Sequence, residues 1–564
     1  MADTRLHELA DRYWAFQREE FPLIGIQAGQ PAAGDLLLRD APADHLRRAA
    51  WADRVLPELD AIDPRGLDSG DRTTHALLRR ELAAYGELVA CGGHLRPSLY
   101  PMGPDFKLTC WASATVLSNL PEARRYLARL SAVPAALAGL CETLRAGRER
   151  GFRYPQLVID RAVAQVRGSL AVPVAEHPFA LPLRRMAGRI AARAPVVEQG
   201  LALINDQIYP ALQAYANFLA RELREGTRTS VACTDDIDGD AHYRFLVAQA
   251  TTLELSPKEI HALGLAEVDR ISARMLTVAA AAGWPGDLPG YRASLQADPS
   301  QYATSADMLR TEMEVLCKRI DARIPEFFGR LPRATFGVNS IPVAISEKMP
   351  PAYAQPNPAD GSAAGVLWIT SVPGKLPRYA HAPIVLHDAW PGHLMQMALT
   401  QEMKHLPPFR RYGAHRYAAC LKGWALYCEQ LGAEMGLYDT PEKRYGRLEM
   451  EMWRAVRLVV DTGLHALGWS GERAVAFFEK HMSMPRSTVE AEVDCHVAMP
   501  AQALAYQLGN LKFREIRQRA EEALGDGFDL RRFHDALLAL GPVPLRMLEG
   551  LMADWTARQT VRAA

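Results

Sequence analysis

The chain has 564 residues with 65 basic and 65 acidic side chains, so its net charge gives no reason to expect a nucleic acid or an anionic membrane as a partner. Because 49% of the residues are hydrophobic and 23% are charged, the chain can bury a large core. Residues 1–20 lack the apolar stretch of a secretory signal and no run of about 18 uncharged apolar residues occurs, so we expect a cytoplasmic protein without a membrane partner.

Most of the chain is predicted to be helical. Ala, Leu, Arg and Glu are frequent, and apolar residues recur at helical spacing, for example at Leu77, Leu78 and Leu82. Pro- and Gly-rich breaks interrupt this pattern without forming a long polar linker. We therefore predict a mainly α fold, with a helical N-terminal half over residues 1–250 and a catalytic half over residues 251–564, joined in one continuous compact unit.

A small β-sheet is predicted in the catalytic half. Residues 362–374 contain a short β-branched and aromatic run between turn residues, which predicts a strand near residues 365–371. Residues 333–338 favour a second strand. An edge strand just before a metal-binding helix is one way to hold an extended peptide through main-chain pairing. The alternative is an ordinary hairpin packed on helices.

The most informative segment is 387–393, His-Asp-Ala-Trp-Pro-Gly-His, within a helix predicted near residues 380–400. It is similar to the HExxH helix of zinc peptidases, whose histidines at i and i+4 share one Zn²⁺ while the glutamate activates water. Here Asp388 holds the glutamate position and the second histidine is at i+6. At about 100° per residue, this spacing separates the side chains of His387 and His393 by roughly 240°, so they need a local break to share an ion.

Pro391 and Gly392 predict such a break. Proline removes a backbone donor and clashes with the preceding turn, whereas glycine relaxes the backbone. Irregularities of this kind in helices are frequent at functional sites. The alternative is a helix that simply ends at Pro391, with His387 as a cation near its C-terminus.

A third metal ligand is expected on a following helix, because catalytic zinc sites use three protein ligands and leave one position open. Residues 415–436 are predicted to be helical, and His415, Lys422 and Glu429 recur every seven residues, near one face. Glu429 is the best carboxylate in this segment. We predict that His387, His393 and Glu429 hold Zn²⁺ or another divalent transition metal, with His415 as a reserve ligand. The alternative for Glu429 is a solvated charge near a helix end.

A polar stripe follows on the next predicted helix, where Arg457, Asp461 and His465 stand at i, i+4 and i+8. One interpretation is a surface face with a weak ion pair. The other, favoured by the apolar residues around the stripe, is a role behind the metal ligands. In that case Asp461 orients a histidine and Arg457 binds a substrate carboxylate with two parallel hydrogen bonds.

Several segments in combination resemble the bacterial DUF885 family. They are Ala352-Tyr353, Asp360-Gly361-Ser362 and residues 387–396, 423–429, 457–465 and 500–503. The resemblance covers nearly the whole chain and is far more specific than any single motif. It implies a large, mostly helical, zincin-like fold similar to the thimet oligopeptidase and carboxypeptidase clans, with a long substrate cleft. It also implies a metal site of two histidines and a glutamate.

The chain departs from the family pattern at positions that carry chemistry. The family usually has glutamate at the position of Asp388, histidine at that of Leu394, and Glu-Gly-Trp where this chain has Lys422-Gly423-Trp424. Cys495-His496 stands where Arg-Tyr is usual, and Ala501 replaces a glycine. An aspartate carboxylate falls about 1.5 Å short of the position that a glutamate reaches, and a misplacement of about 1 Å can cost about a hundredfold in rate.

Roles for the remaining residues follow from these patterns and from the resemblance. Asp388 is expected to be the general base or an acid behind the metal ligands. His496 is expected to be a general acid, because imidazole titrates near neutral pH. His465 and Arg457 complete the expected catalytic group, with Asp461 behind it. The residues expected to bind substrate are Tyr353, Lys422, Gln396 and Tyr506.

Three functions are compatible with these residues. The leading one is a metal-dependent hydrolase of a peptide or small amide bond. The first alternative is a repurposed metal-dependent biosynthetic enzyme in specialised metabolism, with lyase, cyclase or transferase chemistry. The second is a catalytically degenerate protein that binds peptides. The expected partner is a small molecule or a short peptide, and a homodimer is compatible with the sequence.

Overall fold

The computed structural model describes residues 4–29, 37–186, 193–347, 349–361 and 363–563. Its chain divides into two compact units. The N-terminal unit comprises Met1–Tyr243 and Asp494–Met499, and the C-terminal unit comprises Arg244–Val493 and Pro500–Ala564. Ser362, which belongs to one of the family-like motifs, lies outside the described residues.

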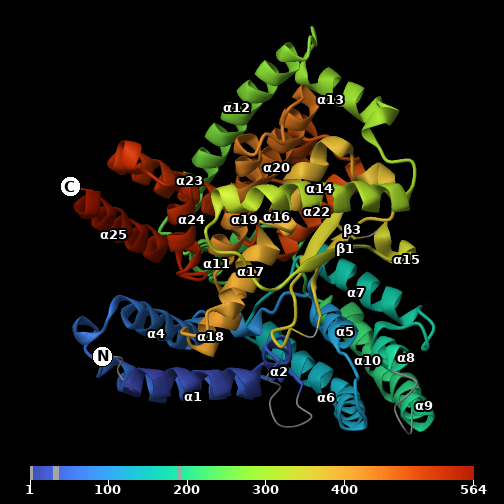
Figure 1. Ribbon diagram of the computed structural model, residues 1–564. Coiled ribbons are helices and arrows are strands. Elements are labelled where there is room, and N and C mark those ends of the chain that lie inside the picture. The colour runs from blue at the N-terminus through green and yellow to red at the C-terminus, as the bar shows by residue number, and fades with distance from the viewer. Residues whose placement is uncertain (1–3, 30–36, 187–192, 348, 362, 564) are drawn as a thin grey trace. The chain divides into compact units, whose positions relative to one another are not determined.

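The N-terminal unit consists of helices (Figure 1). They are α1 (Thr4–Glu20), α2 (Pro22–Gln27), α3 (Pro42–Asp60), α4 (Ser69–Ala90), α5 (Pro104–Ala114), α6 (Leu120–Glu149), α7 (Gln156–Leu170), α8 (Leu181–Arg185), α9 (Arg193–Leu203) and α10 (Tyr209–Phe218). Helix α11 (Gly239–Thr251) spans the sequence boundary between the two units.

Helix α6 is the one helix among the described residues that is long and apolar enough to cross a membrane. Half of its most apolar stretch is buried, and the helix packs against α9 and α10. Core helices of soluble proteins share this length and composition, so α6 is weak evidence for a membrane span.

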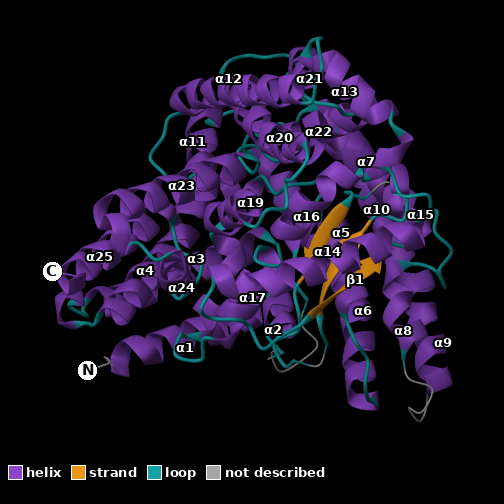
Figure 2. Cartoon of the chain, turned by 45° about the horizontal axis from the view of Figure 1, so that its top comes forward, coloured by secondary structure: helices purple, strands orange, loops and turns teal. Residues whose placement is uncertain are grey.

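The C-terminal unit is also mainly helical and carries the three strands (Figure 2). Its helices are α12 (Pro257–Ala281), α13 (Leu288–Ala297), α14 (Ala306–Phe327), α15 (Val343–Ser346), α16 (His381–Asp388), α17 (His393–Glu402), α18 (Pro408–Tyr412), α19 (Ala418–Glu434), α20 (Pro441–Ala466), α21 (Gly471–His481), α22 (Arg486–Ala498, whose end belongs to the N-terminal unit), α23 (Leu504–Leu524), α24 (Leu530–Leu538) and α25 (Leu545–Ala563). The predicted mainly α fold is confirmed.

Two pairs of closely packed helices form the core of the C-terminal unit. Helix α12 packs along α20, and α19 packs along α23. The second pair meets at two glycines: a Cβ atom added to Gly423 would lie 2.4 Å from the backbone of Gly509. This close approach brings the polar residues of α19 and α23 toward one another. Helix α20 begins at a Thr440 cap followed by Pro441, as capping preferences predict.

The three strands form one small sheet in the order β1-β3-β2 (orange in Figure 2). Strand β1 (Phe336–Ser340) runs parallel to β3 (Gly365–Ile369), and β2 (Ala352–Gln355) is antiparallel to it. Strands near both predicted segments are confirmed. Strand β2 was not predicted; it is only four residues long and lies between prolines.

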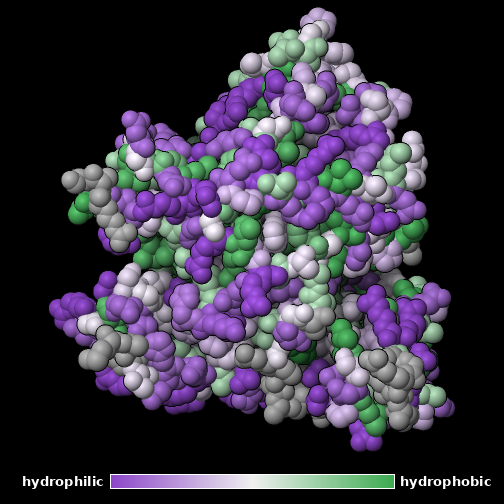
Figure 3. All heavy atoms as spheres, in the orientation of Figure 1, coloured by the Kyte–Doolittle hydropathy of each residue, from purple (hydrophilic) through white to green (hydrophobic). Residues whose placement is uncertain are grey.

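Strand β2 is an edge strand of this sheet and packs against α16 and α17. Its register pairs Tyr353 with Trp368, and the Thr370 amide donates to the Pro351 carbonyl. In an antiparallel pair the hydrogen-bonded residues alternate, so the main-chain groups of Ala352 and Ala354 face away from β3. The face of the molecule drawn in Figure 3 mixes polar residues with small, separate apolar patches.

Candidate metal centre

The predicted helix near residues 380–400 is two helices with a break between them. Helix α16 ends at Asp388 and α17 begins at His393. A Cβ atom added to Gly392 would lie 1.9 Å from the carbonyl oxygen of His387, so only glycine allows the chain to fold back so closely. The local break predicted from Pro391-Gly392 is therefore confirmed.

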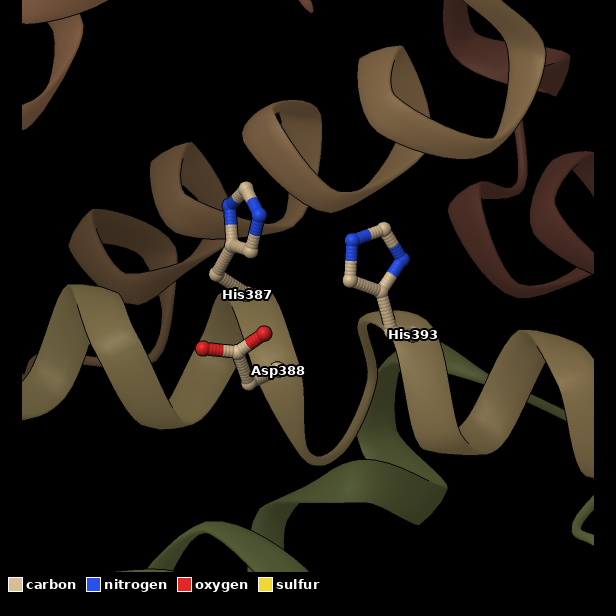
Figure 4. Close-up of side chains that lie close together, drawn as sticks. All are labelled: His387, Asp388 and His393. Atoms are coloured by element: carbon tan, nitrogen blue, oxygen red, sulfur yellow. The ribbon is translucent and has the colours of Figure 1, made fainter. Parts of the chain in front are cut away.

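The break brings three polar side chains together. His387, Asp388 and His393 each offer one ligand atom, and these atoms all lie within 4.8 Å of one another. Both imidazoles lie on the same side of the broken helix, and each turns a nitrogen toward the other (Figure 4). The ring centroids are 4.9 Å apart and the ring planes are nearly perpendicular. Both histidines are buried, and burial holds their pKa values well below the usual range.

Glu429 of α19 contacts His387 on the opposite side of its ring. Its Oε1 lies 2.8 Å from Nδ1 of His387, which leaves Nε2 of His387 to face His393. The Tyr438 hydroxyl fixes the Glu429 backbone by donating to its carbonyl oxygen. Burial raises the pKa of Glu429 to about 7. The structure thus places Glu429 against His387 and not among the three convergent donors.

Asp388 lies between the helix break and the sheet. The backbone amide of Ala354 donates toward its carboxylate from the outer edge of β2. Burial raises the pKa of Asp388 to about 6, whereas the charges of Lys422 and Arg454 oppose this rise. Asp388 therefore links strand β2 to the two histidines of the cluster.

Lys422 and Tyr506 lie beside His393. The Lys422 Nζ is 3.4 Å from Nε2 of His393, the nitrogen that faces the cluster, and 5.4 Å from the centre of the Tyr506 ring. Although burial raises the pKa of the Tyr506 hydroxyl, the nearby cations Lys422, Arg457 and Arg454 bring it below its usual value. Two of the four residues expected to bind substrate therefore adjoin the cluster.

Gln396, also expected to bind substrate, lies one helical turn after His393 on α17. Its Oε1 is buried without a hydrogen-bond partner, and so is Nδ1 of His393. Buried polar atoms nearly always find a partner, so both atoms call for an explanation. The Oε1 of Gln396 is an acceptor and Nδ1 of His393 is a potential donor, although the two are not bonded to each other here.

The residues of the polar stripe on α20 contact different neighbours. Arg457 forms an ion pair with Glu492 at 2.6 Å. Asp461 is fully buried, and its two oxygens accept the Ala501 amide at 3.0 and 3.2 Å. His465 is fully buried on the same helix. These contacts favour a structural role for Asp461, at the start of the segment that leads to Tyr506.

Ala501 offers a test of this anchor because its φ of 67° lies in the left-handed region, which costs a residue other than glycine about 1–2 kcal/mol. We expect Ala501→Gly to destabilise the protein by about 1–2 kcal/mol less than Ala503→Gly. Both changes remove a buried methyl group and loosen the unfolded chain, but Ala503 has an ordinary φ of −73°. Urea unfolding of the two variants measures the difference, and equal losses would contradict strain at Ala501.

Two predicted residues of the C-terminal unit, Tyr353 and His415, are not brought into the cluster, and a third, His496, lies in the other unit. Tyr353 of β2 stacks on Trp368 with ring centroids 6.2 Å apart. His415 is exposed in a short turn that precedes α19, so the predicted helix over residues 415–436 begins later, at Ala418. His496 belongs to the N-terminal unit. Its role as a general acid therefore stays a prediction.

Arg454 is the polar residue near the cluster that the sequence analysis missed. It is 5% exposed on α20, and its charge lowers the pKa values of His387, His393 and Asp388. The signal available in the sequence was an arginine between Met452 and two further apolar residues, Ala455 and Val456. Such a position predicts a buried charge, which usually has a function or a partner.

The donor set fits a divalent metal ion. Two neutral imidazoles and a carboxylate suit zinc, around which ligand atoms lie roughly 3.3 Å apart, so a small inward movement from 4.8 Å suffices. The orphaned atoms of His393 and Gln396 fit as well, because a metal-bound histidine commonly donates its other N–H to a nearby acceptor. Lys422 opposes this arrangement, and its ammonium has to leave His393 before Nε2 can bind a metal.

These observations define a mainly helical protein with a histidine and aspartate centre at a broken helix. The family profile described as "Bacterial protein of unknown function (DUF885)" matches residues 22–552, nearly the whole chain. The chain therefore belongs to the DUF885 family.

Solved structures share this fold. A "putative lipoprotein" from Colwellia psychrerythraea is 25% identical, with a TM-score of 0.90 over 99% of this chain and 100% of that chain. A "putative lipoprotein of unknown function" from Shewanella oneidensis is 16% identical, with a TM-score of 0.74 over 97% of this chain and 99% of that chain, which shows the fold alone. No curated protein matches the chain.

Proposed function

We propose that the protein is a metal-dependent hydrolase of a peptide or small amide bond, with His387, Asp388 and His393 as its metal centre. The observation that carries the proposal is the convergence of these three donors across the broken helix. Zinc, or another divalent transition metal, is the ion that such a donor set favours. A divalent ion held there would polarise an amide carbonyl.

Two residues would orient the histidines. Glu429 accepts from Nδ1 of His387 and so directs Nε2 toward the centre. Gln396 would orient His393 if its buried Oε1, which has no partner, came to accept from Nδ1 of His393, which has none either. We therefore assign Asp388 as the third donor and Glu429 as an orienting group, in place of the ligand role expected for Glu429 from the sequence.

The edge strand supports an extended peptide as substrate. The outward main-chain groups of β2 adjoin Asp388, so a peptide added to this edge would pass beside the centre. A zincin-like relationship and a long substrate cleft, both implied by the family resemblance, belong to this proposal. Proton transfer by His465 or His496 also stays within it, as do a cytoplasmic location, a homodimer and the absence of nucleic-acid and membrane partners.

Two other functions remain as alternatives. A repurposed biosynthetic enzyme would use the same centre for lyase, cyclase or transferase chemistry, and Lys422 beside His393 is the observation that favours it. A degenerate peptide-binding protein would retain the strand edge without a metal. Metal content separates the last function from the other two.

The metal centre can be tested directly on the purified protein by elemental analysis. We expect close to one equivalent of a divalent transition metal, as isolated or after reconstitution. A content below about 0.2 equivalents, with no affinity on reconstitution, would rule out the proposal.

The reaction can be tested with a library of peptides and acyl amino acids incubated with the metal-loaded protein. Cleavage that is lost in His387→Ala and not regained with added metal would support hydrolysis at this centre. No cleavage of any substrate by metal-loaded protein would favour the repurposed enzyme.

Substitutions at Glu429 distinguish an orienting group from a ligand. We expect Glu429→Ala to weaken metal affinity by about ten- to a hundredfold, the usual effect of losing a carboxylate behind a ligand histidine. Glu429→Gln should lose less metal affinity than Glu429→Ala, because an amide oxygen can still accept from His387. Titration with zinc against a competing chelator measures both variants. If Glu429→Gln loses the metal completely, Glu429 is itself a ligand.

A further inference from the structure

Arg454 is a buried cation that forms no direct ion pair within the described chain, although the charge of Glu429 acts against the lowering of its pKa by burial. Its Nη1 donates to the Met450 carbonyl, and its guanidinium lies 4.5 Å from the centre of the Trp453 ring. Its Nε is buried without a hydrogen-bond partner, and no carboxylate of the described chain forms an ion pair with it. A buried charge left unpaired costs several kcal/mol, so proteins rarely retain one without a use.

The neighbouring arginine differs in this respect. Arg457 lies one turn further along α20 and is neutralised by Glu492 at 2.6 Å. The sequence analysis expected Arg457 to bind a substrate carboxylate, but its guanidinium is already engaged. The contacts therefore favour Arg454 for that role.

Lys422 is a second cation at the same place. It forms no ion pair within the described chain, and its Nζ contacts only His393 and the face of the Tyr506 ring. Ring contacts connect the two cations. Arg454 lies over Trp453, Arg457 lies over both Trp453 and Tyr506, and Lys422 lies over Tyr506. The two cations, from α19 and α20, therefore flank the same pair of aromatic rings, and Lys422 contacts His393.

The acidic groups that face these cations have other partners. Glu429 is bonded to His387, Asp388 receives the Ala354 amide, and Glu492 pairs with Arg457. No carboxylate of the described chain accepts from Nε of Arg454, and within that chain the Lys422 ammonium contacts only a histidine nitrogen and a ring face, so both retain donor capacity for a ligand. Donors of this kind bind carboxylates strongly, and arginine does so with two parallel bonds.

We propose that Arg454 and Lys422 form a receptor for a carboxylate of the substrate, beside the His387, Asp388 and His393 centre. The substrates are then peptides with a free C-terminus, or N-acyl amino acids, which carry a carboxylate close to an amide bond. This inference rests on the proposed hydrolase. It also gives Lys422 a purpose, because an ammonium that turns to a substrate carboxylate leaves Nε2 of His393 free to bind metal.

Binding measurements test the receptor independently of catalysis. N-acetyl amino acids and the matching N-acetyl amino acid amides serve as probes, by calorimetry with metal-loaded wild type and Arg454→Met. We expect wild type to bind the acids about ten- to a hundredfold more tightly than the amides, and Arg454→Met to lose this preference. Arg473→Met is the matched control, because Arg473 also lies over a tryptophan but is exposed on α21, and it should keep the preference.

Stability provides a second readout. Removal of an unpaired buried charge should leave the thermal midpoint of Arg454→Met unchanged or raise it, whereas loss of a structural arginine would lower it. Arg454→Lys keeps the charge without the planar fork and should retain part of the preference, which covers the case in which Arg454→Met fails to fold.

The outcomes separate the receptor from the hydrolase. Equal binding of acids and amides by wild type, or an acid preference retained in folded Arg454→Met, would overturn the receptor. Absence of all binding would overturn it as well. If the acids bind through Arg454 but no amide bond is cleaved, the result supports the carboxylate receptor and contradicts the proposed hydrolase activity.

Discussion

For the proposed hydrolase, replacement of His387 by alanine is expected to abolish metal binding and to lower kcat/KM for amide hydrolysis on the order of a thousandfold. His387 supplies one of the three convergent donors and is the histidine held by Glu429. Its loss leaves two donors and an unpaired buried carboxylate. Elemental analysis and steady-state kinetics on the same preparation measure the two effects.

A surface histidine is the appropriate control for this variant. His405 is exposed shortly after α17, so His405→Ala should retain both metal and activity. If His387→Ala instead keeps a full equivalent of metal and wild-type kinetics, the ion and the reaction are located elsewhere in the protein.

Gly392→Ala should be nearly as damaging, although it adds only one methyl group. The new Cβ would lie 1.9 Å from the His387 carbonyl oxygen and 2.4 Å from that of Leu386. Both oxygens belong to the backbone of α16, so the turn has to open and move His393. We expect a loss of about 3 kcal/mol in the free energy of unfolding. A displacement of His393 by about 1 Å would lower activity by about a hundredfold.

Gly374 provides the matched control for this substitution. A Cβ atom at Gly374 meets nothing within 4 Å, so Gly374→Ala should change stability by less than about 0.5 kcal/mol. Urea unfolding and zinc titration are the measurements. A Gly392→Ala variant as stable as Gly374→Ala would show that the turn at residues 389–392 relaxes easily.

Local chemistry made part of this molecule predictable. Helical periodicity gave the mainly α fold, and the strand near residues 365–371 followed from a β-branched run between turn residues. The approach of His387 to His393 was also predictable. Residues six apart on a regular helix point in different directions, and Pro391-Gly392 breaks the helix between them. Each of these predictions depends on neighbours in the sequence.

The partners of charged side chains were less predictable. A polar stripe shows that Arg457 and Asp461 share a face, but not that Glu492 and the Ala501 amide face them from distant segments. Spacing by seven residues placed Lys422 and Glu429 on one face of α19, yet they contact different histidines. Strand β2 was missed because its four residues carry almost no periodic signal.

The outward edge of β2 bears on the length of the fragment that the proposed hydrolase would release from a peptide. Only Ala352 and Ala354 turn their main-chain groups outward, and the Ala354 amide donates to Asp388. An added peptide would therefore pair with Ala352 and with the Ala354 carbonyl, and such contacts recur about every 7 Å along a strand. A slip by one residue would turn every side chain of the peptide to the opposite face. With its terminal carboxylate held by Arg454 and Lys422, a peptide could occupy only one register beside Asp388. The distance from that carboxylate to the centre would then set the number of residues released in each cleavage.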